Sequence, residues 1–158
     1  MNSLPASPLA PATGLRFFEF YRDGRIDPVG VAALLDIRCP EVEDGRIVFT
    51  CKTRGEFGNP LGQLHGGITA TLLDSAMACA VHTTLPANQA YASLDISVRY
   101  IRPGAVDGGE LRAEGRVMHR GRKVCTAEAT LHDDAGNLIA TATSSLMVLP
   151  LNQPAAAS

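Results

Sequence analysis

Apolar and polar residues alternate through most of the second half of the chain. The first such run places its apolar residues on one face, at Ala92, Leu94, Ile96, Val98 and Tyr100. A period of two is typical of strands that hold one face against a core. The runs with this period are 92–101, 110–119, 123–132 and 138–149. Short turn-forming sequences separate the last three, so the pattern predicts an antiparallel meander of strands.

The first half of the chain predicts a hairpin followed by one long helix. Residues 38–54 form two strand-like runs that break at Asp44-Gly45, a dipeptide typical of two-residue hairpin turns. Residues 65–84 are rich in alanine and leucine, contain no proline and stop before Leu85-Pro86. We therefore expect the longest helix there. A shorter helix is expected over 28–35, which opens with proline.

One long apolar helix has to cover one face of about six strands. Both elements are buried most simply if a curved antiparallel sheet wraps around the helix, so the sequence predicts a single α+β domain. We assign this domain to residues 28–149. An N-terminal extension is expected over 1–27 and a flexible tail over 150–158, because proline and alanine dominate both ends.

The composition is that of a soluble globular protein and excludes several classes of function. Of 158 residues, 46% are hydrophobic and 19% are charged, and the net charge is −2, so no basic field would attract nucleic acid. Residues 64–85 hold too many polar residues to span a membrane, and the N-terminus lacks the features of a secretory signal. The four cysteines and four histidines lack the spacing of metal ligands. We expect a cytoplasmic protein with reduced thiols, no metal, and no nucleic-acid or membrane partner.

Asp74 is the only charged residue between Phe57 and Leu94, if the histidines are neutral. An ionised carboxylate buried without a partner costs several kcal/mol, or its pKa rises. An aspartate in the middle of an apolar helix is therefore of two kinds. It is either hydrogen-bonded to a neighbouring turn or strand, or it is a desolvated general base or nucleophile.

The start of the same helix offers a second candidate, the run His65-Gly66-Gly67. Glycines let a ligand approach the backbone, and free N–H groups at a helix N-terminus favour developing negative charge, as in an oxyanion hole. Gly66 and Asp74 are eight residues, or about 12 Å, apart along one helix. One reacting carbonyl cannot easily touch both, and the simplest way for both to serve one site is that they come from two antiparallel subunits. The sequence thus predicts a homodimer with two composite sites.

Four segments resemble the hotdog-fold acyl-CoA thioesterases, above all their phenylacetate-pathway (PaaI-like) branch. These segments are Asn59, 64–67, 69–74 and 92–95, and the resemblance covers about residues 28–149. It implies a sheet wrapped around a central helix, dimers with active sites between the subunits, and often tetramers. It also implies an acyl-CoA substrate with a small, medium-chain or aromatic acyl group. Coenzyme A enters as part of that substrate, so no separate cofactor is expected.

The resemblance also implies a role for each motif residue. Asp74 matches the nucleophile or general base that acts on the thioester carbonyl, and Gly66 matches the residue whose backbone N–H polarises that carbonyl. Asn59 matches an amide that orients the thioester or water, Ser93 a serine that helps to hold the water, and His65 an orienting histidine. The sequence leaves open whether Asp74 activates water or attacks directly to form an anhydride.

Coenzyme A carries phosphates, and a local surplus of basic residues lies between positions 99 and 123. By the family pattern, Arg102 and the turn Arg120-Gly121-Arg122 are expected to meet these phosphates, with Gly67 beside the bound substrate. The aromatic-rich segment 14–27 is a candidate cap for the acyl pocket.

Two other functions share parts of this pattern. Hotdog hydratases and dehydratases carry an Asp-x-Asn-Pro-Leu-His signature, and this chain contains Asn59-Pro60-Leu61. However, Phe57 and Gly62 stand where the Asp and His of that signature belong. A non-catalytic acyl-CoA sensor would keep the glycines and basic residues, but Asp74 would cost it stability without serving binding. Hydrolysis is therefore the preferred prediction.

Overall fold

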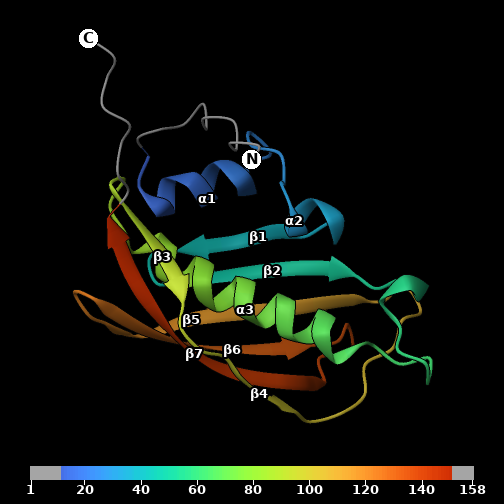
Figure 1. Cartoon of the computed structure of the whole chain (residues 1–158). Coiled ribbons are helices and arrows are strands. Elements are labelled where there is room, and N and C mark those ends of the chain that lie inside the picture. Colours follow the sequence, from blue (N-terminus) through green and yellow to red (C-terminus); the bar gives the residue numbers. More distant parts are fainter. Residues whose placement is uncertain (1–11, 151–158) are drawn as a thin grey trace, which may run out of the picture.

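The computed structural model describes residues 12–150 and shows a curved antiparallel sheet with one long helix on its concave face (Figure 1). The helices are α1 (Gly14–Arg22), α2 (Val31–Leu34), the 3₁₀ helix η1 (Gly55–Phe57) and α3 (Gly66–Thr83). The strands are β1 (Arg38–Glu43), β2 (Arg46–Lys52), β3 (Gln89–Ser93), β4 (Ser97–Tyr100), β5 (Glu110–Arg120), β6 (Val124–His132) and β7 (Leu138–Pro150). The predicted α+β architecture of the hotdog fold is confirmed.

The strand order follows from the predicted hairpin and meander. The order is β1-β2-β5-β6-β7-β3, and β4 pairs with the other half of β7, so seven strands occupy six positions across the sheet. The β1–β2 turn lies at Asp44-Gly45 as expected, and Gly45 has a φ of +79°, which glycine adopts without strain. The sheet thus matches the expected width of about six strands.

The run 92–101 forms two strands rather than the one continuous strand that alternation predicts. Ser93 pairs with Leu146 of β7, and Ser97 pairs with Thr143 of the same strand. Between these pairs, three residues on the β3–β4 side face two residues on β7. This count is that of a β-bulge, in which one residue is inserted on one side only.

The bulge changes which side chains face the core. The carboxylate of Asp95 accepts a backbone N–H from β7 at 3.0 Å and so holds the inserted segment in place. Gln89, Ala90 and Tyr91 are half-buried before the bulge and Val98 after it, while Leu94 and Ile96 are exposed. The prediction of a single apolar face over this run is therefore wrong, because an odd insertion reverses the alternation.

Helix α3 confirms the helix predicted over 65–84, and it is buried because its side chains are small and apolar. Ala76, Met77 and Ala80 are fully buried. The helix backbone lies very close to β5 at Gly115, where a Cβ atom would lie 2.2 Å from the carbonyl oxygen of Ala76. Only glycine permits this approach, which fixes the height of α3 above the sheet.

Helix α1 packs onto the same core, although it belongs to the segment predicted as an N-terminal extension. Phe18 is only 5% exposed and meets the ring of Phe49 edge-on, with centroids 6.2 Å apart. The backbone N–H of Gly14 donates to the carbonyl of Leu85 just after α3, at 3.1 Å. Residues 1–11 of the predicted extension and 151–158 of the predicted tail lie outside the described residues.

Among residues 12–150, no helix has the length and apolar character needed to cross a bilayer. The same part of the chain contains no group of three or more His, Cys, Asp and Glu side chains that could hold a metal ion.

Candidate active site

The first turn of α3 leaves one backbone N–H group free. His65 caps this helix: its Nδ1 accepts the N–H of Gly67 at 2.9 Å, and its carbonyl accepts those of Ile68 and Thr69 at 3.0 and 3.2 Å. An accepting Nδ1 requires a neutral imidazole with its proton on Nε2. Within residues 12–150 the N–H of Gly66 has no acceptor. It is available to bind negative charge at the positive end of the helix dipole.

Tyr100 fixes the other side of Gly66. Its hydroxyl donates to the Gly66 carbonyl at 2.9 Å, and a Cβ atom at position 66 would lie only 3.1 Å from that hydroxyl. A cavity of about 490 Å³ opens beside these residues, and Gly67 and Arg102 also line it. Sequence reasoning placed Tyr100 on a strand face but missed this contact, because its partner lies 34 positions away.

Asn59 shapes the loop that leads into α3. Its side-chain oxygen accepts the backbone N–H groups of Leu61 and Gln63 at 2.9 and 3.1 Å, and its own N–H donates to the Gln63 carbonyl at 2.7 Å. The beginning of this loop is tied to the start of α3, because the N–H of His65 donates to the Phe57 carbonyl at 2.8 Å. The side-chain oxygen of Asn59 thus holds the loop in shape, while the side-chain NH₂ group has no acceptor in the described chain.

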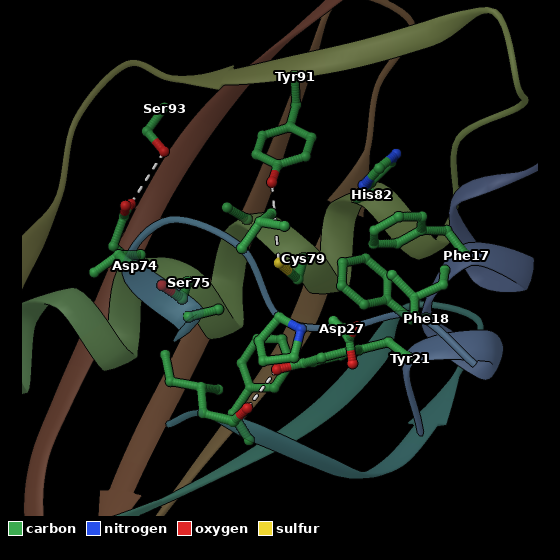
Figure 2. Close-up of a pocket in the computed structure, with 18 residues that line it drawn as sticks. Phe17, Phe18, Tyr21, Asp27, Asp74, Ser75, Cys79, His82, Tyr91 and Ser93 are labelled. Carbon is green, nitrogen blue, oxygen red and sulfur yellow. Dashed lines mark hydrogen bonds between the residues drawn. The ribbon is translucent and has the colours of Figure 1, made fainter. Parts of the chain in front are cut away.

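Asp74 lies in the third turn of α3 and faces β3. The hydroxyl of Ser93 donates to Oδ1 of Asp74 at 3.0 Å, which unites two of the predicted site residues (Figure 2). Asp74 is half-buried and Ser93 is exposed, so the carboxylate is partly desolvated and accessible at the same time. Its second oxygen, Oδ2, has no partner within residues 12–150. Ser93 therefore points from β3 toward α3.

An apolar cavity of about 420 Å³ extends from Asp74 between α1, α3, β2 and β3 (Figure 2). Phe17, Phe18 and Tyr21 of α1 form one wall of this cavity. The hydroxyl of Tyr21 donates to the carbonyl of Ile37, and burial raises the pKa of Tyr21 to about 12. The spacing of the three aromatic residues along one helical face is the signal in the sequence that identifies this wall.

Gly66, Arg120 and Arg122 do not lie beside Asp74 within one subunit. Gly66 and Asp74 line different cavities, as their separation of about 12 Å along α3 requires. Arg120 forms an ion pair with Asp44, with both carboxylate oxygens at 2.9 Å. Asp44 lies in the β1–β2 turn, which is tied to the C-terminal end of α3. Arg120 and the exposed Arg122 therefore lie near that end, about 25 Å of helix away from the start of α3.

Comparisons with known proteins show the family to which the chain belongs. The family model described as "Thioesterase superfamily" matches residues 61–140. A protein of Halobacterium salinarum is 34% identical over an alignment of 112 residues that covers 67% of this chain and 72% of that protein. Acyl-coenzyme A thioesterase 13 of Mus musculus is 30% identical over 96 residues, which are 60% of this chain and 67% of that protein. The crystal structure of a phenylacetic acid degradation-related protein from Ralstonia eutropha superimposes with a TM-score of 0.75 at 31% identity, covering 83% of this chain and 98% of that one. The chain belongs to the thioesterase superfamily.

Proposed function

We propose that this protein hydrolyses acyl-CoA thioesters with a small, medium-chain or aromatic acyl group to the free acid and coenzyme A. One observation carries the proposal: α3 presents a free N–H at Gly66 and, two turns later, the Asp74 carboxylate at the mouth of an apolar cavity. Thioester hydrolysis requires these two functions, a donor for the developing oxyanion and a base or nucleophile. Membership of the thioesterase superfamily supports the same reaction.

The chemistry follows from the free atoms of the site. The N–H of Gly66 binds the carbonyl oxygen, while Ser93 holds Oδ1 of Asp74 and leaves Oδ2 for the reaction. As a general base, Asp74 takes a proton from water, the hydroxide adds to the thioester carbon, and the C–S bond breaks to release CoA thiolate. In the covalent alternative, Asp74 itself displaces the thiolate, and water then hydrolyses the anhydride. Asn59 orients the thioester or water with its NH₂ group.

Two subunits complete each site in this proposal. Strand β3 ends the sheet, and Leu94 and Ile96 beside it are 51% and 41% exposed. Pairing this edge with the same edge of an antiparallel second copy would extend the sheet and cover both side chains. It would also place Gly66 of one α3 near Asp74 of the other. A homodimer is therefore part of the proposal, and further assembly to a tetramer rests on the family resemblance.

Basic residues around the site are candidates for the phosphates of coenzyme A. Arg102 is the best placed, because it lines the cavity beside Gly66 and Gly67. Arg120 and Arg122 would meet the phosphates only from a neighbouring subunit, and Arg120 would first exchange its ion pair with Asp44.

The cysteines are free thiols, which supports a cytoplasmic location.

Release of CoA thiol from acyl-CoA esters of graded size tests the reaction. We expect Asp74→Asn to lower kcat at least about a hundredfold in a folded protein. Gly66→Pro removes the proposed oxyanion donor at the first helical position, where proline is tolerated, and should lower kcat by about 10²–10³. Gly66→Ala is the matched control, because it adds the same Cβ near Tyr100 but keeps the N–H. Equal loss in the two Gly66 variants would contradict the oxyanion role. No turnover with intact ester binding would indicate an acyl-CoA sensor instead.

Co-expression of Gly66→Pro and Asp74→Asn subunits tests the composite site. A mixed dimer would contain one site with both lesions and one site with none, so random assembly should restore about one quarter of wild-type activity. If both residues acted within one subunit, every site would carry a lesion and activity would stay at the level of the separate variants.

A further inference from the structure

The apolar cavity runs along one face of α3. Asp74, Ala78 and His82 line it at intervals of four residues, with Ser75 and Cys79 beside them, as neighbours on one helical face do. Asp74 and Ser93 lie at one side of the cavity, and His82 lies at the other with Phe17 and Phe18 (Figure 2). The eight residues from Asp74 to His82 correspond to about 12 Å of helix. An acyl chain attacked at Asp74 would therefore extend toward His82.

His82 is enclosed by aromatic rings. Phe17 stacks on it at a centroid distance of 6.2 Å, Phe18 meets it edge-on at 5.6 Å, and Tyr91 lies at 5.2 Å. Within residues 12–150, neither ring nitrogen of His82 has a hydrogen-bond partner. Burial lowers the pKa of His82, so the ring is neutral at physiological pH. It then offers one donor and one acceptor.

Tyr91 adds a second uncharged polar group to the same wall. Its hydroxyl lies 3.9 Å from the sulfur of Cys79, which is a weak partner. The neighbouring Cys79 sulfur and burial raise the pKa of Tyr91, so the phenol keeps its proton. The lining otherwise holds two carboxylates, Asp74 and Asp27, which would repel an anionic chain end. No described side-chain nitrogen or oxygen is both buried and unpaired, so the ring nitrogens of His82 are accessible to a ligand or water.

We propose that His82 and Tyr91 select acyl groups that carry an uncharged hydrogen-bonding group, such as a hydroxyl or keto oxygen, at the end remote from the thioester. The proposal rests on the proposed thioesterase function. It makes His82 a specificity residue, because it contacts the chain end and not the reacting carbonyl. With carbon–carbon bonds of about 1.5 Å at tetrahedral angles, bridging this distance takes roughly six to ten carbons. The preferred substrates are thus medium-length acyl-CoA esters with a polar far end.

Matched esters separate this selection from hydrolysis itself. We would measure kcat/KM for octanoyl-CoA, 8-hydroxyoctanoyl-CoA and suberoyl-CoA, and their Kd values on Asp74→Asn. The hydroxy ester should be preferred over octanoyl-CoA by about threefold to tenfold, since it satisfies a polar group that is otherwise unpaired. Suberoyl-CoA, with its anionic end, should be the poorest of the three.

Variants of His82 assign the preference. His82→Phe keeps the ring in its aromatic surroundings and should abolish the preference, so that kcat/KM for the hydroxy ester falls to the value for octanoyl-CoA. His82→Gln restores a donor and an acceptor and should recover part of it, and Tyr91→Phe should reduce it. Equal kcat/KM for the hydroxy and plain esters in the wild type would overturn the proposal and leave the thioesterase function standing. If nothing is hydrolysed, the Kd values on Asp74→Asn still decide whether the cavity selects the polar chain end.

Discussion

The close approach of α3 to β5 at Gly115 predicts a large effect from a single added methyl group. In Gly115→Ala the new Cβ would lie 2.2 Å from the carbonyl oxygen and 2.4 Å from the carbonyl carbon of Ala76, and 2.9 Å from the backbone nitrogen of Met77. All three atoms are helix backbone, so no side-chain rotation relieves the clash. The helix would have to move away by about 1 Å to restore ordinary contact distances.

The cost is set by overpacking. Extra methyl groups in a filled core typically cost about 1–3 kcal/mol, and alanine recovers up to about 1 kcal/mol through its lower flexibility in a strand. A backbone clash belongs at the upper end, so we expect a net loss of about 2 kcal/mol in the free energy of unfolding. For a chain of this size that corresponds to a Tm lower by about 4–8 °C. Because Asp74 lies one half-turn before Ala76, kcat should fall by about tenfold to a hundredfold as well.

Urea denaturation followed by circular dichroism, at matched protein concentration, measures the loss. Gly55→Ala is the control, because nothing lies within 4 Å of the added Cβ and its φ is not in the left-handed region. It should stay within about 0.5 kcal/mol of the wild type. A Gly115→Ala protein as stable and active as this control would refute the conclusion that backbone contact fixes α3 on the sheet.

Three further outcomes are expected. Arg46 holds the pKa of Glu114 below its ordinary value through a hydrogen bond, so Arg46→Gln should lower the free energy of unfolding by about 2 kcal/mol at pH 7. The difference from wild type in urea midpoint should shrink below pH 4.5, because Glu114 becomes protonated in both proteins. His65→Ala removes the cap of α3 and should lower unfolding free energy by about 1 kcal/mol, with no change expected if Gly67 found another acceptor. Burial raises the pKa of Cys39 and Cys79 to about 12. Both thiols should therefore react slowly with a disulfide reagent at pH 8 until guanidinium unfolds the chain. Fast labelling of the folded protein would contradict this expectation.

Local sequence patterns predicted the elements well where one rule dominated. The helix over 65–84 was recognisable because proline bounds a long apolar run, and the hairpin because Asp44-Gly45 fits a tight turn. Alternation failed over 92–101 because a one-residue bulge leaves no mark in the period-two pattern. Its cause is the pairing of β7, which is remote in sequence.

The candidate site shows the same division. Asp74 was identifiable because a lone charge in an apolar helix is costly, whereas its hydrogen bond with Ser93 was not predicted. The contacts of Tyr100 with Gly66 and of Tyr91 with His82 were not predictable, because each joins β3 or β4 to α3 across the fold. Such contacts depend on tertiary packing, which no local pattern encodes.

Gly66 and Asp74 lie on one rigid helix, so the proposed activity depends on how the subunits assemble. Within a subunit, α3 holds Gly66 and Asp74 about 12 Å apart, and a helix packed this closely on its sheet cannot shorten that distance. The distance between the oxyanion donor and the carboxylate that share one substrate is then set by the contact between subunits. If the proposed composite site is right, catalytic geometry would be lost when the dimer separates, even if each subunit keeps its fold, because each chain would supply only half of each site.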